Sequence, residues 1–240
     1  MSAKSDQFEK DVAKSIDTIA GIKASRPSVG TEYPDVLLEY NKKKTWLEVK
    51  MNHTDNLSNP RVFYKNGIWS TTYKTPAAKE AVKLLNKSNK TKQFIKSLSE
   101  FSGIELSKIK IPTTKGGLKE IGAVPLDMMK KYFNQPFINR YIAIDENIDM
   151  GSLVTDHYTI GKKEAAFYMQ AKDDFYRISK TDPFRLGNDI PLLSGNGDFK
   201  VRVATRSHFY EVQAELKIKK MPHSKYSLNP KTNKKNPFLK

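Results

Sequence analysis

Two short runs of alternating polar and apolar residues limit the possible folds of this 240-residue chain more than any other part of it. They are Asp35-Val-Leu-Leu-Glu-Tyr40 and Thr45-Trp-Leu-Glu-Val-Lys50, and the polar segment Asn41-Lys-Lys-Lys44 separates them. Such alternation is typical of half-buried strands, and a polar connection of this length is typical of a hairpin. The sequence therefore predicts an antiparallel hairpin over residues 35–50.

The two faces of this predicted hairpin differ in chemistry. Pairing Tyr40 with Thr45 closes the loop and places Asp35 opposite Lys50, with Glu48 as a diagonal neighbour. Because side chains alternate along a strand, Asp35, Glu48 and Lys50 project from one face. The opposite face is apolar and needs a core to pack against; it consists of Val36, Leu38, Leu47 and Val49.

Two carboxylates that converge on a rigid hairpin suit a hard divalent cation. Proteins bind Mg²⁺ through one or two carboxylates, and the ion keeps several waters and accepts phosphate oxygens of a substrate. A bound cation polarises a phosphoryl group and lowers the pKa of its coordinated water. The ammonium of Lys50 can orient or help to deprotonate that water and offset negative charge in the transition state. This face therefore predicts a Mg²⁺ (or Mn²⁺) site for hydrolysing phosphodiester bonds.

The first segment of the chain is predicted to be a helix with one apolar stripe at helical spacing: Phe8, Val12, Ile16 and Ile19. At about 100° per residue, Glu9 lies at the edge of this stripe and faces the protein. A glutamate in this position is, by itself, more often a rim residue paired with a lysine. Both interpretations of Glu9 stay open at this point.

Pro34-Asp35 followed by Glu48-Val49-Lys50 resembles the motif of the PD-(D/E)XK nucleases, which include restriction endonucleases, junction resolvases and phage recombination nucleases. The resemblance implies Asp35, Glu48 and the carbonyl of Val49 as metal ligands. It implies Lys50 as the group that positions the water. An acidic residue on the first helix often completes the site in this family, and Glu9 matches its place.

The resemblance covers about residues 5–145 and implies an α/β fold, a restriction-endonuclease-like mixed sheet flanked by helices. The buried strand predicted at Arg140–Ile144 would be its last element. We therefore expect a nuclease core with a helical insertion over residues 1–145. A β-rich C-terminal region for substrate recognition is expected over 146–220, and a mobile basic tail over 221–240.

The balance of charge favours a polyanionic partner, most simply nucleic acid. Lys and Arg number 42 against 26 Asp and Glu, a net charge of +16. The candidates for DNA contact are the lysines of the hairpin loop and three residues of a second predicted hairpin: Lys42, Lys43, Lys44, Arg61, Tyr64 and Trp69. A place in the core is an equal alternative for Trp69.

Other features narrow the class of protein. The absence of cysteine excludes disulfides, thiolate zinc sites and cysteine nucleophiles, and it suits a cytoplasmic location. No apolar run approaches the roughly 18 residues of a membrane span, and the N-terminus shows no secretory signal. Glu215-Leu216-Lys217, with Asp198 upstream, repeats the carboxylate–lysine spacing but is more typical of an exposed strand face.

These observations predict a metal-dependent endonuclease that cleaves duplex DNA, of a restriction-like or phage type. The alternatives are a structure-selective resolvase or exonuclease of the same fold, and a nucleic-acid-binding protein without catalysis. A basic RNA-binding or ribosome-associated protein would account for the charge but would leave the acidic hairpin face without a purpose. Cutting both strands usually takes two active sites, so the prediction is compatible with a homodimer.

Overall fold

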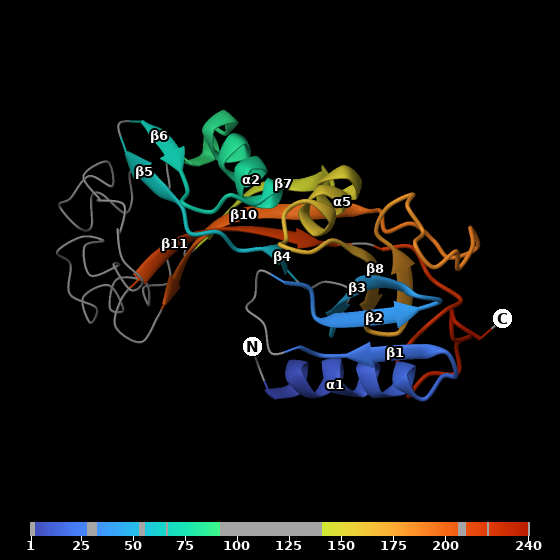
Figure 1. Ribbon diagram of the computed structural model, residues 1–240. Coiled ribbons are helices and arrows are strands. Elements are labelled where there is room, and N and C mark those ends of the chain that lie inside the picture. The colour runs from blue at the N-terminus through green and yellow to red at the C-terminus, as the bar shows by residue number, and fades with distance from the viewer. Residues whose placement is uncertain are drawn as a thin grey trace. The chain divides into compact units, whose positions relative to one another are not determined.

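A computed structural model describes residues 3–27, 33–52, 56–65, 67–91, 141–205, 210–219 and 221–239. This part of the chain is a mixed α/β protein with several sheets and few helices (Figure 1). It divides into two compact units: unit 1 comprises residues 1–55, 149–197 and 218–240, and unit 2 comprises residues 56–148 and 198–217. The predicted helical insertion beyond residue 91 lies outside the described residues.

Unit 1 is built on a five-stranded sheet with the strand order β1-β2-β3-β8-β9. These strands are β1 (Ile22–Ser25), β2 (Val36–Tyr40), β3 (Lys43–Lys50), β8 (Ala166–Ala171) and β9 (Asp174–Arg177). Neighbouring strands are antiparallel except for β3 and β8, which are parallel. Parallel neighbours need a long crossover between them, and its last element here is the helix α5 (Gly151–Thr159).

The helix α1 (Ala3–Asp17) packs on the apolar face of this sheet. Its predicted stripe and the apolar face of the hairpin meet in one cluster that includes Val12, Ile16, Val36, Leu38, Leu47 and Val49. Burying one such aliphatic side chain contributes about 1.5–3 kcal/mol. The predicted orientation of the hairpin is therefore confirmed, and its polar residues lie on the opposite face.

The turn of the hairpin is tighter than the sequence predicted. Tyr40 pairs with Lys43, so the turn consists of Asn41 and Lys42 alone. Both turn residues have positive φ, 49° and 63°, as a type I′ turn requires. The predicted pairing of Tyr40 with Thr45 is wrong by two residues.

A register shift of two residues changes which side chains oppose each other but keeps each on its face, because the side-chain period is also two. Val36 pairs with Leu47, and continuing this register places Asp35 opposite Glu48 instead of Lys50. The two carboxylates are therefore closer neighbours than expected.

The strand that completes the sheet of unit 1 is β8, not the predicted strand at Arg140–Ile144. That segment begins β7 (Tyr141–Asp149), which belongs to a second sheet with the order β4-β11-β10-β7. The other members of the second sheet are β4 (Asn56–Ser58), β10 (Asn196–Thr205) and β11 (Tyr210–Ile218). Both candidate segments are short apolar runs, and periodicity cannot tell which of them pairs with β3. The expected boundary at residue 145 consequently does not separate the two structural units, because each unit contains residues from both sides of it.

Unit 2 also contains a hairpin of β5 (Phe63–Lys65) and β6 (Ile68–Ser70), followed by α2 (Pro76–Lys87). Thr75 caps the start of α2, since its hydroxyl accepts a hydrogen bond from the Ala78 N–H at 3.3 Å and Pro76 takes the first helical position. Within the described ranges, no helix has both the length and the apolar character that crossing a membrane requires.

The segment 221–240, predicted to be a mobile tail, packs on unit 1 in its described part. Tyr226 and Leu228 are buried and join the core cluster of α1 and the sheet. Lys234 Nζ lies 2.6 Å from Oδ1 of the buried Asp174. The lysine content of this segment suggested a solvated tail, but a few apolar side chains among the lysines attach it to the core.

Candidate active site

The structure brings together the three polar residues that the hairpin pattern singled out. Asp35 Oδ2 accepts a hydrogen bond of 2.8 Å from the backbone N–H of Val49, which holds this carboxylate beside β3. Lys50 Nζ lies 2.6 Å from Glu48 Oε1. All of these groups lie at the end of the hairpin that is furthest from its turn.

Glu48 is a buried carboxylate between two ammonium groups. Its side chain is 2% exposed, with Lys50 on Oε1 and Lys162 Nζ at 3.9 Å from Oε2. Among the described residues, Oε2 has no hydrogen-bond partner. Burial by itself would raise the pKa of Glu48, but Lys50 and Lys162 hold this pKa below its usual value. Glu48 is therefore ionised, and one of its oxygens can accept a further ligand.

Asp35 titrates very differently from Glu48. Burial and the negative charge of Glu48 raise the pKa of Asp35 to about 7, although Lys50 and the Val49 N–H oppose the shift. A carboxyl group with a strongly raised pKa beside an ionised carboxylate marks a place where negative charge is not fully compensated. A divalent cation would supply the missing compensation.

Lys50 is a permanent cation in this environment. Burial works against its charge, but Glu48 beside it raises the pKa of Lys50 well above its ordinary value. Because its pKa is raised, the Lys50 amine stays protonated at neutral pH and cannot act as the base that removes a proton from water. Of the two roles expected for Lys50, this supports orientation and charge compensation rather than deprotonation.

The carbonyl of Val49 lies at the same edge of β3. The N–H and C=O of a strand residue point to the same side, and the Val49 N–H points to Asp35. The residue opposite Val49 in this register is Pro34, which has no N–H to donate to that carbonyl. Two carboxylates and a main-chain carbonyl are oxygen ligands of the kind that Mg²⁺ binds, with water in the remaining positions. The residues present therefore fit the expected ion.

No group of three or more His, Cys, Asp or Glu side chains in the described ranges is arranged to hold a metal. A divalent cation at this site would accordingly depend on Asp35, Glu48, the Val49 carbonyl and water. Such a sparse protein ligand set is characteristic of Mg²⁺ sites that also bind substrate phosphate.

Three residues at this site were missed by the sequence analysis: His157, Tyr158 and Lys162. Lys50 Nζ and Lys162 Nζ each lie 5.9 Å from the centroid of the buried Tyr158 ring. Burial and the nearby ammonium of Lys162 lower the pKa of His157 to about 4, so His157 is neutral at pH 7.

The sequence does contain a signal for the helix that carries His157 and Tyr158. Its buried residues are Leu153, Val154, His157 and Tyr158, a spacing that repeats on one face of a helix. This spacing predicts α5 but does not predict that α5 packs beside Glu48. That contact depends on the pairing of β8 with β3.

Glu9 faces the interior, as predicted, and its side chain is only 3% exposed. Its principal partner is Arg26, whose Nε donates to Glu9 Oε2 at 2.8 Å, and Ser5 Oγ donates to Oε1 at 3.2 Å. The interpretation of Glu9 as a rim residue paired with a lysine is therefore wrong. The charge of Glu9 contributes to the raised pKa of Asp35, whereas a role for Glu9 in catalysis stays a prediction.

Arg26→Met should destabilise the protein, because it leaves the Glu9 carboxylate buried without its cation. Breaking a buried ion pair costs about 3–5 kcal/mol, and we expect about 2–3 kcal/mol because the Arg26 side chain is itself 24% exposed. Urea unfolding measures this free energy. Lys10→Met is the control: the Lys10 side chain is 55% exposed in its pair with Asp6, so this substitution should change the free energy of unfolding very little. Equal stability of the two variants would contradict the assignment.

Lys42 in the hairpin turn and Lys43 and Lys44 at the start of β3 lie at the end of the hairpin opposite to the carboxylates. Lys42 to Glu48 spans six residues, roughly 20 Å along a strand at about 3.3 Å per residue. Lys43 Nζ donates to the Pro183 carbonyl at 3.1 Å, and Lys44 Nζ lies 2.7 Å from Glu39 Oε1. The structure gives these lysines other partners than the candidate metal ligands, and their contact with phosphates stays a prediction.

The other three candidates for DNA contact belong to unit 2. Trp69 is 2% exposed, and its ring packs on Tyr64 with 5.2 Å between centroids. Of the two alternatives for Trp69, the structure supports a place in the core, so this side chain is not available to stack on a base. Contact of Arg61 and Tyr64 with DNA stays a prediction.

The second carboxylate–lysine segment is not the exposed strand face that its spacing suggested. Glu215 is 4% exposed, and its carboxylate lies 2.8 Å from Lys200 Nζ and 3.1 Å from Arg202 Nε. Its charge is compensated by cations of the neighbouring strand β10. Glu215 therefore serves as a structural ion pair of the second sheet.

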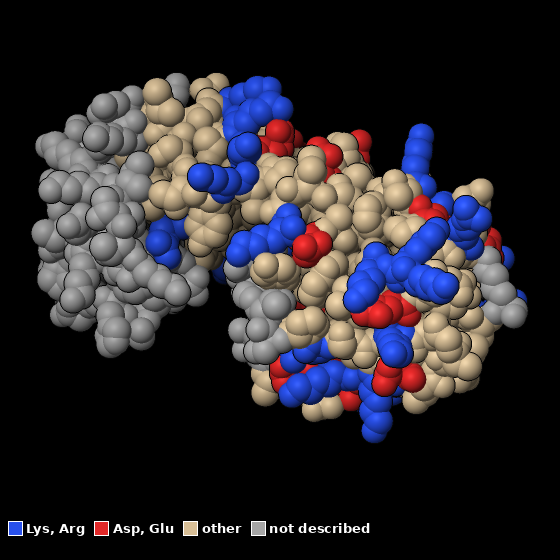
Figure 2. All heavy atoms as spheres, viewed as in Figure 1, with Lys and Arg blue, Asp and Glu red and all other residues tan. Residues whose placement is uncertain are grey.

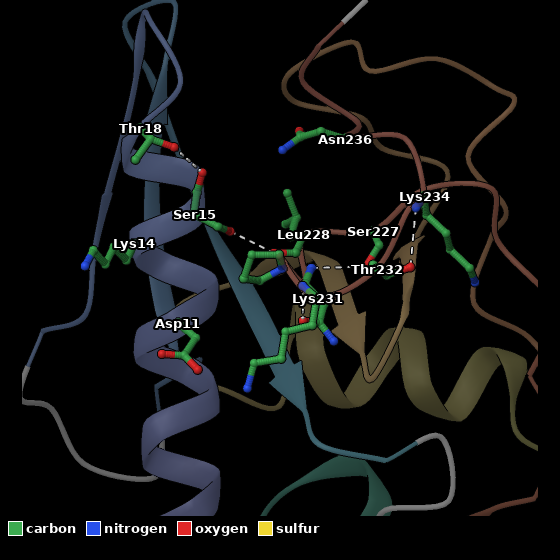
Figure 3. A pocket seen from close by; sticks show the side chains of 12 residues that line it. Asp11, Lys14, Ser15, Thr18, Ser227, Leu228, Lys231, Thr232, Lys234 and Asn236 are labelled. Atoms are coloured by element: carbon green, nitrogen blue, oxygen red, sulfur yellow. Dashed lines mark hydrogen bonds between the residues drawn. The ribbon is translucent and has the colours of Figure 1, made fainter.

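A pocket of about 600 Å³ lies between α1 and the C-terminal segment of unit 1 (Figure 3). Its lining includes Asp11, Lys14, Lys231 and Lys234. Asp11 is the one acidic residue of this lining, and its carboxylate accepts a hydrogen bond from Gln7 at 2.7 Å. The pocket lacks the pair of converging carboxylates found at Asp35 and Glu48.

No protein-family model matches the chain, and no curated protein matches it. Among solved structures, the chain has a weak similarity to HhaI endonuclease in complex with DNA. The two share 12% sequence identity over 92% of this chain and 88% of that chain, with a TM-score of 0.28. A likeness of this size does not establish a fold, and the case for a function depends on the site itself.

Proposed function

We propose that this protein is a metal-dependent DNA endonuclease of the restriction-endonuclease-like, PD-(D/E)XK type. The observation that carries the proposal is the convergence of Asp35, Glu48 and Lys50 on one hairpin face, where Glu48 Oε2 has no hydrogen-bond partner among the described residues. The order of elements in unit 1 supports it: α1, three antiparallel strands, then α5 and the parallel strand β8. This arrangement, with β8 as the last strand, agrees with the mixed sheet flanked by helices that the resemblance implies.

Asp35, Glu48 and the Val49 carbonyl would hold Mg²⁺ or Mn²⁺. When bound, the ion polarises the scissile phosphate and activates a water. Lys50, which stays protonated, orients the attacking water through a hydrogen bond and offsets the negative charge that develops on the phosphate. A bond forms from the water oxygen to phosphorus, and one sugar O–P bond breaks. A proton leaves the water for solvent, and the departing sugar oxygen takes up a proton.

The charge of the chain supports DNA as the substrate. The net charge is +16, and lysines and arginines are spread over the face of the described residues that Figure 2 shows, with acidic residues among them. Lysines attract the phosphate backbone without reading its sequence. Cleavage of both strands would call for two such sites, which a homodimer supplies.

Digestion of a mixed panel tests the proposed function: supercoiled plasmid, linear duplex, four-way junction, single-stranded DNA and RNA, each with Mg²⁺, Mn²⁺ or EDTA. We expect cleavage of duplex DNA that requires the divalent cation. Glu39→Gln is the matched control, because Glu39 lies on the same hairpin face beside the turn and pairs with Lys44; this variant should cut like the wild type.

The panel also separates the alternatives. Cleavage of the junction alone would indicate a resolvase, and degradation from duplex ends alone would indicate an exonuclease of the same fold. Salt-sensitive binding without cleavage in any cation would contradict the proposed function and favour a nucleic-acid-binding protein without catalysis.

A further inference from the structure

A second ammonium group reaches the candidate site from the turn between α5 and β8. Lys162 Nζ lies 3.9 Å from Glu48 Oε2, and the Lys162 side chain is 14% exposed. The same ammonium donates a hydrogen bond of 3.4 Å to the carbonyl of Tyr33, just before Pro34-Asp35. Lys162 is thus held between the two segments that carry the candidate metal ligands.

The two lysines approach Glu48 in different ways. Lys50 Nζ is in direct contact with Oε1 at 2.6 Å, whereas Lys162 Nζ stays 3.9 Å from Oε2. Oε2 has no hydrogen-bond partner in the described residues. A lysine whose role is to pair with a buried carboxylate normally forms a charge-assisted hydrogen bond of about 2.7–2.9 Å. The longer distance leaves Oε2 open to a metal ion, with an ammonium group beside it.

The charges at this site explain what a second ammonium group contributes. Asp35 and Glu48, when both are ionised, are balanced by Lys50 and Lys162, while Glu9 is paired with Arg26 and His157 is neutral. A divalent cation would then leave two positive charges, which match the charge of a phosphodiester at its transition state. Without Lys162, only one of these positive charges would remain.

We propose that Lys162 is a second catalytic cation. When the carboxylate of Glu48 binds a divalent cation, the Lys162 ammonium binds a non-bridging oxygen of the scissile phosphate. This inference rests on the proposed function and extends it to a residue outside the motif. In the metal-free protein, Lys162 stands near Glu48 as a substitute for part of the cation's charge.

Metal binding without DNA gives the first test. Lys162→Met keeps the aliphatic chain beside Tyr158 and removes the charge, so Mn²⁺ should bind roughly 3–10-fold more tightly by isothermal titration calorimetry, because a repelling cation is lost. Lys163→Met is the matched control: Lys163 Nζ lies over the Tyr33 ring at 5.3 Å, and its loss should leave Mn²⁺ affinity unchanged. Equal or weaker affinity in Lys162→Met would overturn the placement of Lys162 beside the metal.

Cleavage kinetics give the second test. At saturating Mg²⁺, Lys162→Met should lower kcat about 100-fold with little change in KM, since the lost contact acts on charge that develops during the reaction. Lys162→Arg should recover part of the rate. Lys162→Gln removes the charge with a different side chain and should show the same loss of kcat, which separates the effect of charge from any disturbance of packing by methionine. Wild-type kcat in both neutral variants would overturn the inference alone. An inactive wild type would instead overturn the proposed function, and the phosphate role of Lys162 with it.

Discussion

Asp35→Asn is expected to stop cleavage and also to stabilise the metal-free protein above pH 7. Burial and the charge of Glu48 raise the pKa of Asp35 to about 7, whereas an unfolded aspartate titrates near 3.9. Between these values the folded protein keeps a proton that the unfolded chain has released, so its stability falls as the pH rises. Asparagine does not titrate and avoids this loss.

The size of this effect follows from the shift in pKa. One pKa unit corresponds to about 1.4 kcal/mol, so the gain in unfolding free energy at pH 8 should be on the order of 2–4 kcal/mol. Urea unfolding in EDTA from pH 4 to pH 8 measures it, with Glu39→Gln as the control that should follow the wild type. Mg²⁺ should stabilise the wild type and not Asp35→Asn. If the free energy of unfolding depended on pH in the same way for the wild type and Asp35→Asn, the pKa of Asp35 would not be raised in the folded protein.

Glu48→Gln is expected to stop cleavage too, but with the opposite effect on stability. The pKa of Glu48 is held below its usual value by Lys50 and Lys162, so its charge stabilises the fold at neutral pH, and this contribution is lost as the pH falls through the folded pKa. The substitution leaves two partly buried ammonium groups without their carboxylate, since the Lys50 side chain is 24% exposed and the Lys162 side chain 14%. Breaking a buried pair from one side costs about 3–5 kcal/mol, and we expect about 2–3 kcal/mol because both cations are partly exposed.

The same unfolding series in EDTA checks this second prediction. At pH 8, Glu48→Gln should be less stable than the wild type and Asp35→Asn more stable, although both are inactive. The double variant Lys50→Met/Glu48→Gln is the control that should recover part of the loss, since it removes the ammonium group in direct contact with Glu48. A change of the same sign in both single variants would refute the different charge states assigned to these two carboxylates.

The faces of the hairpin could be predicted because they depend only on the alternation of side chains. That alternation survived a register error of two residues. The register itself could not be predicted, because the tight turn depends on positive φ at Asn41 and Lys42. Glycine is the usual signal for such a turn, and neither position has it.

The rest of the site depends on contacts between distant parts of the chain. The inward direction of Glu9 follows from helical spacing, but its pairing with Arg26 depends on where β1 ends beside α1. Lys162 lies in a short turn without a motif, and its distance to Glu48 depends on the parallel pairing of β8. Both β8 and the segment predicted at Arg140–Ile144 are short apolar runs, and their sequences do not show which of them pairs with β3.

The parallel pairing of β3 with β8 also determines when this site is completed during synthesis. The ladder joins Lys50 to Ala171, and closing a loop of this length is entropically costly and slows folding. α1 and the first three strands leave the ribosome well before β8, and until β8 arrives β3 has an unpaired edge that other chains could join. The motif is therefore translated early, but Tyr158 and Lys162 reach it only when the second half of the chain has been made, so a nascent chain that stops before β8 carries the complete motif without the complete site.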